Sequence, residues 1–199
     1  MTRRSPFPLV TALLAVAIVA VFAVELASPD PMTFAEAHGF VAATPSFGSA
    51  LTSMLVHDPD GLAHVGGNLL VLLVVGTLVE RAIGSLRFLA LFAAGGIAGA
   101  ALHCVVDSSI LVGCSGSLFA VLAVAAAIYG PAMLTFVAVL IAAAIGQAFG
   151  FGGSGDAGVS FACHLGGFAL GAAVVVLSRL RGVDLRGELQ AQAVTVRGG

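Results

Sequence analysis

Ser115 and His164 have the side chains best suited to covalent chemistry in this sequence, and each lies in an apolar stretch where a polar group is costly. A serine hydroxyl becomes a nucleophile when an adjacent base takes its proton, and imidazole is the commonest such base. Gly113 and Gly116 flank Ser115, and their missing Cβ atoms would let another backbone or a substrate approach closely. The two residues are a candidate nucleophile and base, although each could instead be a structural hydrogen-bonding group.

A second polar pair, His64 and Asn68, lies in another apolar stretch. Residues four apart share one face of a helix, so both side chains would point to one place. Both side chains donate hydrogen bonds, which a site that stabilises an oxyanion requires. Polar contact between packed helices is the alternative role for this pair.

Small and aromatic residues near these groups would allow the elements that carry them to meet. Gly167 and Gly171 form a small-xxx-small step after His164, and such steps let two helices pack closely. Phe119 follows Ser115 by one helical turn, so it would lie on the same face and support the imidazole ring. We therefore expect close packing between the helix of Ser115 and the helix of His164.

The elements that position these residues must be membrane helices. Of the 199 residues, 59% are apolar and only 9% are charged, and the mean hydropathy is +1.11. A soluble surface needs about a quarter to a third of its residues charged, so most side chains here must face lipid or one another. The net charge of -2 and the lack of a basic run exclude nucleic acid as a partner.

Six apolar stretches have the length of a membrane helix, about 20 residues. They cover residues 8–27, 62–79, 86–106, 110–129, 132–149 and 159–180. The sequence thus predicts an all-α fold, a polytopic membrane protein with a bundle of six transmembrane helices. The predicted organisation is an N-terminal segment 1–7, a membrane domain 8–181 with an external loop 28–61, and a tail 182–199. A cleaved signal peptide is the alternative for the first stretch, which exceeds the usual apolar core of about 7–15 residues.

Charges predict the orientation of these helices. All eight basic residues are arginines, and in the six-helix arrangement they fall on one side of the membrane, opposite the acidic connections. Because positive charge collects in cytoplasmic loops, we expect both termini in the cytoplasm, and the alanine- and glycine-rich composition suggests a bacterial plasma membrane. Asn68, Ser115 and His164 would then each lie about five or six residues inside the opposite face, roughly 8–10 Å below the surface.

The three cysteines, Cys104, Cys114 and Cys163, have neither the CxxC spacing of zinc sites nor the even number of a disulfide framework. We expect them to pack as small apolar residues, and we expect no metal and no cofactor. Cys114 and Cys163 adjoin Ser115 and His164, so a response to oxidation is the alternative for these two.

The order of these motifs along the chain resembles that of the rhomboid family of intramembrane serine proteases. The resemblance extends over residues 51–171. Its motifs are Leu51-Thr52-Ser53-Met54 with His57; His64-x-x-x-Asn68; Glu80-Arg81-x-x-Gly84; Gly113-x-Ser115-Gly116 with Phe119; and His164-x-x-Gly167-x-x-x-Gly171. Many bacterial members carry a Trp-Arg pair in the first external loop, and this chain lacks it.

The resemblance implies a protease in which Ser115 is the nucleophile and His164 the general base, without a carboxylate. The backbone N–H of Ser115 and the side chains of His64 and Asn68 would stabilise the oxyanion. By the same resemblance, the substrates are membrane proteins whose transmembrane helix carries small or helix-destabilising residues, and they enter sideways from the lipid bilayer. Supporting residues would be Gly113, Gly116, Phe119, Gly167 and Gly171.

Two other functions are compatible with parts of the sequence. A catalytically inactive relative would act as a scaffold, but it would be expected to lack the serine or the histidine, and both are present. A metal-binding or transport protein would use His64, His103, His164 and the three cysteines. That reading leaves Asn68 and the glycines around Ser115 unexplained, and transporters usually show an internal repeat. The protease is therefore the function that we expect.

Overall fold

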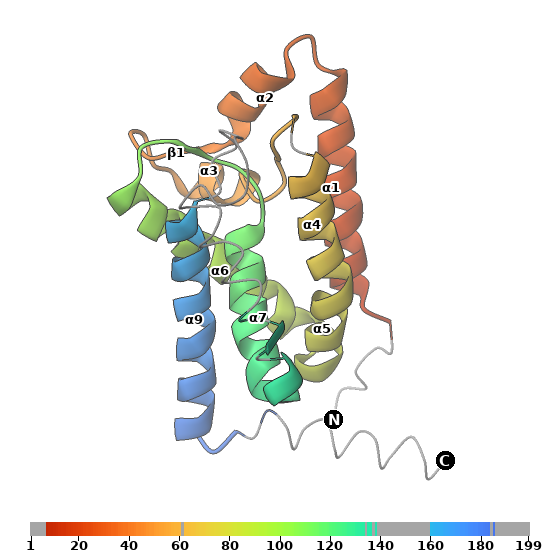
Figure 1. Ribbon diagram of the computed structural model, residues 1–199, viewed down its shortest axis with the longest axis vertical. Helices are drawn as coiled ribbons and strands as arrows, with labels where there is room; N and C mark the ends of the chain where they lie inside the picture. Colours follow the sequence, from red (N-terminus) through yellow and green to blue (C-terminus); the bar gives the residue numbers. More distant parts are fainter. Residues whose placement is uncertain are drawn as a thin grey trace.

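Long helices form the frame of the molecule (Figure 1). The computed structural model describes residues 7–60, 62–133, 135–136, 138, 160–183 and 185. Four helical runs within them are long and apolar enough to cross a membrane: α1 (Leu9–Ala27), the run Leu62–Ile83, α6 (Ser85–Val106) and α9 (Phe161–Leu180). The helical membrane architecture is thus confirmed. The predicted span 132–149 lies largely outside the described residues.

The run Leu62–Ile83 is one continuous helix in three parts. They are α4 (Leu62–Val71), the π-helical turn η1 (Leu72–Gly76) and α5 (Thr77–Ile83). The helix continues past its predicted end at residue 79, because Glu80 is buried rather than placed at a water interface. It ends at Gly84, whose φ of 88° is a left-handed conformation that favours glycine.

Glu80 fixes the beginning of α1 to the junction of α5 and α6. Its carboxylate accepts hydrogen bonds from the backbone N–H groups of Val10 (3.0 Å) and Thr11 (2.7 Å). The hydroxyl of Ser85 donates a third bond at 2.7 Å. The first N–H groups of a helix have no partner within the helix, so a buried carboxylate there satisfies both sides. One side chain thereby joins three helices.

The predicted loop 28–61 is a structured segment. It contains α2 (Pro31–His38), β1 (Phe40–Val41) and α3 (Phe47–Thr52). Asp30 caps α2 by accepting hydrogen bonds from the N–H groups of Met32 and Thr33. β1 pairs antiparallel with β2 (Ile110–Leu111), which belongs to the segment just before Ser115. The loop is therefore tied to the chain that leads into the candidate site.

The fourth predicted span, 110–129, is wrong at its beginning, because the helix α7 (Ser115–Tyr129) begins at Ser115. Residues 110–111 form β2, and Gly113 has a φ of 99°, which an α-helix does not accommodate. Leu111 and Cys114 are nonetheless buried. Non-helical backbone is tolerated at membrane depth where protein surrounds it, and hydropathy does not distinguish such a segment from a helix. Ser115 is thus the first residue of its helix, not one several residues inside it.

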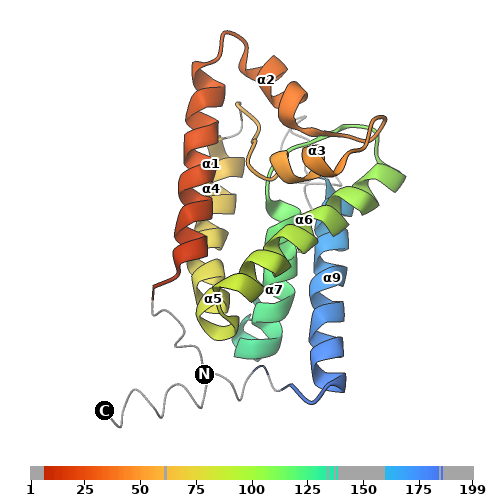
Figure 2. The same cartoon turned by 180° about the vertical axis from the view of Figure 1, so that it is seen from behind.

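The central helix of the described bundle is α7. Almost all of its side chains are buried, and α6 and α9 are its principal neighbours. Figure 2 shows α6 crossing α7 and α9 obliquely, while the α4 to α5 run stands on the other side of α7. With 15 residues, α7 is about 22 Å long, which is shorter than a membrane core of about 30 Å. Its first residue, Ser115, is half-buried.

Glycines allow α7 and α9 to touch through their backbones. A Cβ atom on Gly167 would collide with the carbonyl oxygen of Gly116, and one on Gly171 would collide with that of Ala120. On α6, a Cβ atom on Gly99 would lie 2.8 Å from the carbonyl oxygen of Cys163. Three helices thus approach one another more closely than any residue with a side chain would permit.

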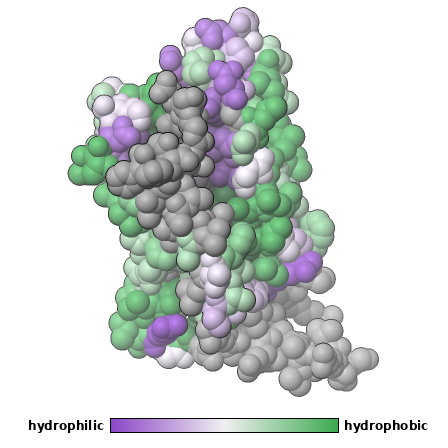
Figure 3. Space-filling model, viewed as in Figure 1, coloured by the Kyte–Doolittle hydropathy of each residue, from purple (hydrophilic) through white to green (hydrophobic). Residues whose placement is uncertain are grey.

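Apolar side chains cover the flanks of the bundle. In Figure 3 polar residues gather toward its two ends, and apolar ones lie along α1 between them. On α1, Leu13, Val16 and Val24 are each more than half exposed. Such a surface would aggregate in water, and a surrounding hydrocarbon phase accounts for it.

We expect the Gly167→Ala variant to be less stable than the native protein. Its methyl group would overlap the Gly116 carbonyl, so α7 and α9 must separate, at a cost of about 1–3 kcal/mol. The measurement is the thermal unfolding midpoint in one detergent. Gly66→Ala is the matched control, because its added Cβ meets no atom within 4 Å. A midpoint equal to the native value in Gly167→Ala would contradict the packing described above.

Candidate active site

Ser115 begins α7 at the end of a short, tightly held turn. The N–H of Gly113 donates a 2.8 Å hydrogen bond to the Ser53 carbonyl, and Cys114 is fully buried. Leu118 is the first residue of α7 to bond back along the helix, to the Cys114 carbonyl at 3.0 Å. Amides at the start of a helix carry partial positive charge. A half-buried serine hydroxyl therefore lies at the positive end of α7.

His164 lies in the first turn of α9, against α7. Ser160 caps this helix by accepting a 3.1 Å hydrogen bond from the N–H of Cys163, and the N–H of His164 donates to the Ser160 carbonyl at 3.2 Å. The imidazole stacks on Phe119, with ring centroids 4.3 Å apart and planes 8° apart. Phe119 is one turn after Ser115, so the stacking brings His164 alongside the beginning of α7.

The residues next to Ser115 and His164 also touch. A Cβ atom on Gly116 would lie 2.6 Å from the sulfur of Cys163, and Gly167 abuts the Gly116 backbone. The first turns of α7 and α9 are therefore in direct contact. The imidazole of His164 is 5% exposed, and its Nδ1 has no hydrogen-bond partner among the described residues.

His64 and Asn68 reach the same place from α4. A Cβ atom on Gly113 would lie 2.9 Å from both the Cε1 and Nε2 atoms of His64, and 3.3 Å from Nδ2 of Asn68. Gly113 is two residues before Ser115. Three helices thus bring the four predicted polar residues to one region, and Gly113 leaves room for the two that come from α4.

His57 fixes the amide of Asn68, a role that sequence reasoning missed. Nδ1 of His57 lies 3.2 Å from the Leu55 carbonyl, and Nε2 lies 3.1 Å from Nδ2 of Asn68. A carbonyl only accepts, so Nδ1 donates, and Nε2 of the neutral ring accepts from the amide of Asn68. Glu25 accepts the backbone N–H of His57 at 3.4 Å. In the sequence, Glu25 stands out as an acidic residue inside the first apolar span, 8–27.

Burial keeps His57 uncharged. Removal from water lowers the pKa of its imidazole to about 4, and the nearby imidazole of His64 adds to the lowering. Its ring lies 5.4 Å from that of His64, centroid to centroid. At neutral pH, Nε2 of His57 therefore remains an acceptor, and Asn68 continues to donate to it.

The cysteines and His103 are buried or partly buried. Cys114 and Cys163 are buried free thiols, and Cys104 is a partly buried one. His103, which a metal site would need, directs one ring nitrogen to Ser160 and the other to the Ser109 carbonyl. Among the residues that the structure describes, no three His, Cys, Asp or Glu side chains come together as metal ligands.

One known protein family matches this sequence. The family model of the rhomboid domain matches residues 45–181, which is more than half of the chain and includes all four polar residues. No individual curated protein matches the sequence. With its long apolar helices, the chain is a membrane-embedded protein, and it belongs to the rhomboid family of intramembrane proteases.

Proposed function

We propose that this protein is an intramembrane serine endopeptidase in which Ser115 attacks the peptide bond and His164 is the general base. The observation that carries the proposal is the stacking of His164 on Phe119, one turn after Ser115, at a ring distance of 4.3 Å. Membership of the rhomboid family also supports the proposal. Acyl transfer by a serine requires an activating base, and the N–H groups at a helix start can stabilise the oxyanion.

The reaction divides between the two residues. The Ser115 oxygen bonds to the carbonyl carbon while its proton passes to His164, and His164 then protonates the leaving amine as the C–N bond breaks. A water molecule, deprotonated by His164, hydrolyses the resulting ester. A dyad must orient its imidazole without a carboxylate, and the nearly parallel Phe119 ring fixes the plane of His164.

The oxyanion would be stabilised from two sides. The backbone N–H of Ser115, at the positive end of α7, is one donor. The side chains of His64 and Asn68, both beside Gly113, supply the others. His57 accepts one N–H of the Asn68 amide, so the amide nitrogen is held in place and its second N–H is available to the substrate oxygen.

We place the reaction in the extracytoplasmic half of the membrane. Arg81 and Arg87 flank the α5 to α6 junction, and Arg179 is near the end of α9, at the lower end of Figure 1. The start of α7 lies toward the other end, and so does α2, which belongs to the loop that carries acidic residues. Positive charge marks the cytoplasmic side, so both termini would be cytoplasmic. From the alanine- and glycine-rich composition, the membrane that we propose is a bacterial plasma membrane.

The substrates would be membrane proteins that enter from the lipid bilayer through a transmembrane helix. Carbonyl groups inside a helix are engaged in hydrogen bonds, so the helix must unwind locally before Ser115 can reach one. Segments with small or helix-destabilising residues unwind at the lowest cost. These are the substrate segments that we expect to be cleaved.

Cleavage of a model membrane substrate in detergent should depend on both members of the dyad. We expect Ser115→Ala and His164→Ala to lower kcat by about a thousandfold or more, because neither residue has a substitute. Ser117→Ala is the matched control. Its buried hydroxyl has no partner in the described part of the chain, so activity should remain near the native level. Cleavage that persists in Ser115→Ala would reject the assigned nucleophile.

Acid should destabilise the protein through His57. In the unfolded chain this imidazole takes up a proton near pH 6.5, whereas in the folded protein it does so only near pH 4. The unfolded state therefore binds more protons between these values, and the free energy of unfolding falls as the pH drops through this window. His64 lies beside the same ring, and Glu25 accepts the backbone N–H of His57. Both are titratable, so a variant is needed for comparison.

His57→Gln provides that comparison. Glutamine keeps an oxygen that can accept from Asn68 but does not titrate. We expect the unfolding midpoint of the native protein to fall more steeply between pH 6.5 and 4.5 than that of His57→Gln, measured in the same detergent. Identical pH profiles would mean that His57 is not held neutral by its surroundings.

A further inference from the structure

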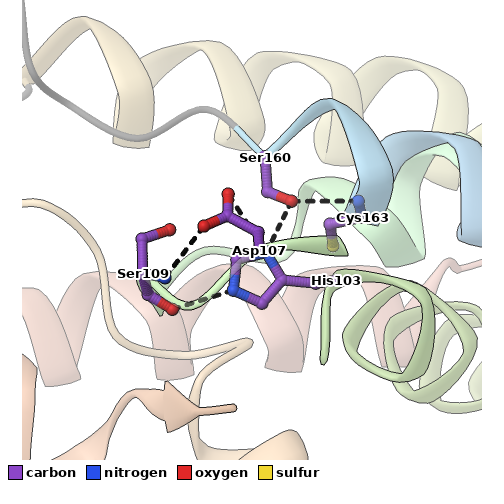
Figure 4. Close-up of polar contacts among 5 residues, drawn as sticks. All are labelled: His103, Asp107, Ser109, Ser160 and Cys163. Atoms are coloured by element: carbon purple, nitrogen blue, oxygen red, sulfur yellow. Dashed lines mark hydrogen bonds and ion pairs between the residues drawn. The ribbon is translucent and has the colours of Figure 1, made fainter. Parts of the chain in front are cut away.

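His103, a buried histidine outside the proposed dyad, joins the two chain segments that lead to Ser115 and His164 (Figure 4). It lies near the end of α6 and has no exposed surface. Its Nε2 is 2.9 Å from the Ser109 carbonyl oxygen, and its Nδ1 is 2.7 Å from the Ser160 hydroxyl. One ring therefore contacts segments that are 51 residues apart in the sequence (109 to 160).

The hydrogen bonds around this ring run in one direction. The Ser109 carbonyl only accepts, so Nε2 of His103 donates to it. In the neutral ring Nδ1 then accepts, and the Ser160 hydroxyl donates to it. The same hydroxyl oxygen accepts the N–H of Cys163 at 3.1 Å. Each donor of this network has an acceptor, and the Asp107 carboxylate lies 3.8 Å from the same Nδ1.

Both ends of the network are a few residues from the proposed reacting groups. Ser109 is six residues before Ser115, and the segment between them consists of β2 and the turn that contains Gly113. Ser160 is four residues before His164 and accepts the N–H of His164 through its own carbonyl. Only a few residues therefore separate this hydrogen-bond network from Ser115 and from His164.

Packing around His103 leaves the ring little freedom. Phe40 of β1 meets it edge to face, with centroids 6.5 Å apart. Asp107, four residues on, accepts the N–H of Ser109 at 2.8 Å and so holds the carbonyl segment. Gly99, one turn before His103, lets the Cys163 backbone come against α6. The end of α6 thus contacts both the segment of Ser109 and the segment of Ser160.

We propose that His103 is a positioning residue that sets the spacing between Ser115 and His164 by hydrogen bonding the segment that precedes each of them. The role rests on the proposed function. Without this ring, the first turn of α9 and the turn before α7 would lose their common attachment to α6. A displacement of about 1 Å between nucleophile and base lowers a rate by about 100-fold.

The test is the rate constant for phosphonylation of the detergent-solubilised protein by a fluorophosphonate, in which the Ser115 oxygen bonds to phosphorus and fluoride leaves. This rate constant does not depend on how much of the protein is folded. We expect His103→Leu to lower it about 10- to 100-fold. His103→Gln retains a donor and an acceptor and should recover most of the rate. Val105→Leu, at a position 79% exposed on the same helix, is the control and should leave it unchanged. A native rate in His103→Leu would overturn the proposal.

A double-variant cycle separates this role from general stabilisation. If His103 acts through Ser160, the loss of phosphonylation rate in the double variant should be smaller than the product of the losses in His103→Leu and Ser160→Ala. Independent losses that multiply in the double variant would overturn the proposed link. Ser160→Gly preserves most of the helix cap while removing the hydroxyl, so a rate as low as that of Ser160→Ala would assign the loss to the link.

Amide hydrogen exchange tests the link without relying on activity. We expect faster exchange at Cys163 and His164, and at Gly113, in His103→Leu than in the native protein. Unchanged exchange at these amides would reject the positioning role. A native protein that cleaves nothing and is not phosphonylated by the probe would instead reject the proposed function, whatever the exchange shows.

Discussion

Backbone contact between α7 and α9 is the constraint on which the site depends. The Gly116 carbonyl occupies the place that a side chain on Gly167 would need, and the Ala120 carbonyl does the same at Gly171. Serine is short, so a histidine on a neighbouring helix reaches it only where the helix axes are close. The stacking of His164 on Phe119 follows from the same closeness. The other residues of the site act on a serine and a histidine whose helices this contact brings together.

Several buried polar side chains of the bundle have fixed hydrogen-bonding roles. Glu80 binds the start of α1, His57 holds Asn68, and His103 holds Ser160. Polar atoms left without partners at membrane depth are costly, and they are informative where they occur. Nδ1 of His164 is such an atom among the described residues. In the proposed mechanism, this nitrogen of the general base is therefore not engaged by another described side chain.

Hydropathy predicted the ends of α1, α6 and α9 to within two residues, because long apolar runs leave a membrane helix few alternatives. It misplaced the beginning of α7, since residues 110–114 are buried by protein whether or not they are helical. The left-handed Gly113 is the local reason, and a glycine in so glycine-rich a chain gave no clear signal. The contacts of Glu25 with His57, and of His103 with Ser160, join residues 32 and 57 positions apart. Such contacts depend on tertiary packing, so spacing along the chain did not predict them.

Mapping the residue that a fluorophosphonate modifies would test the proposed dyad most directly. The purified protein would be labelled in detergent, digested, and its peptides identified by mass spectrometry. A single adduct on Ser115 in the native protein, lost in His164→Ala, is the result that the Ser115–His164 arrangement predicts. Equal labelling of Ser115 in His164→Ala, or an adduct on another residue, would contradict it.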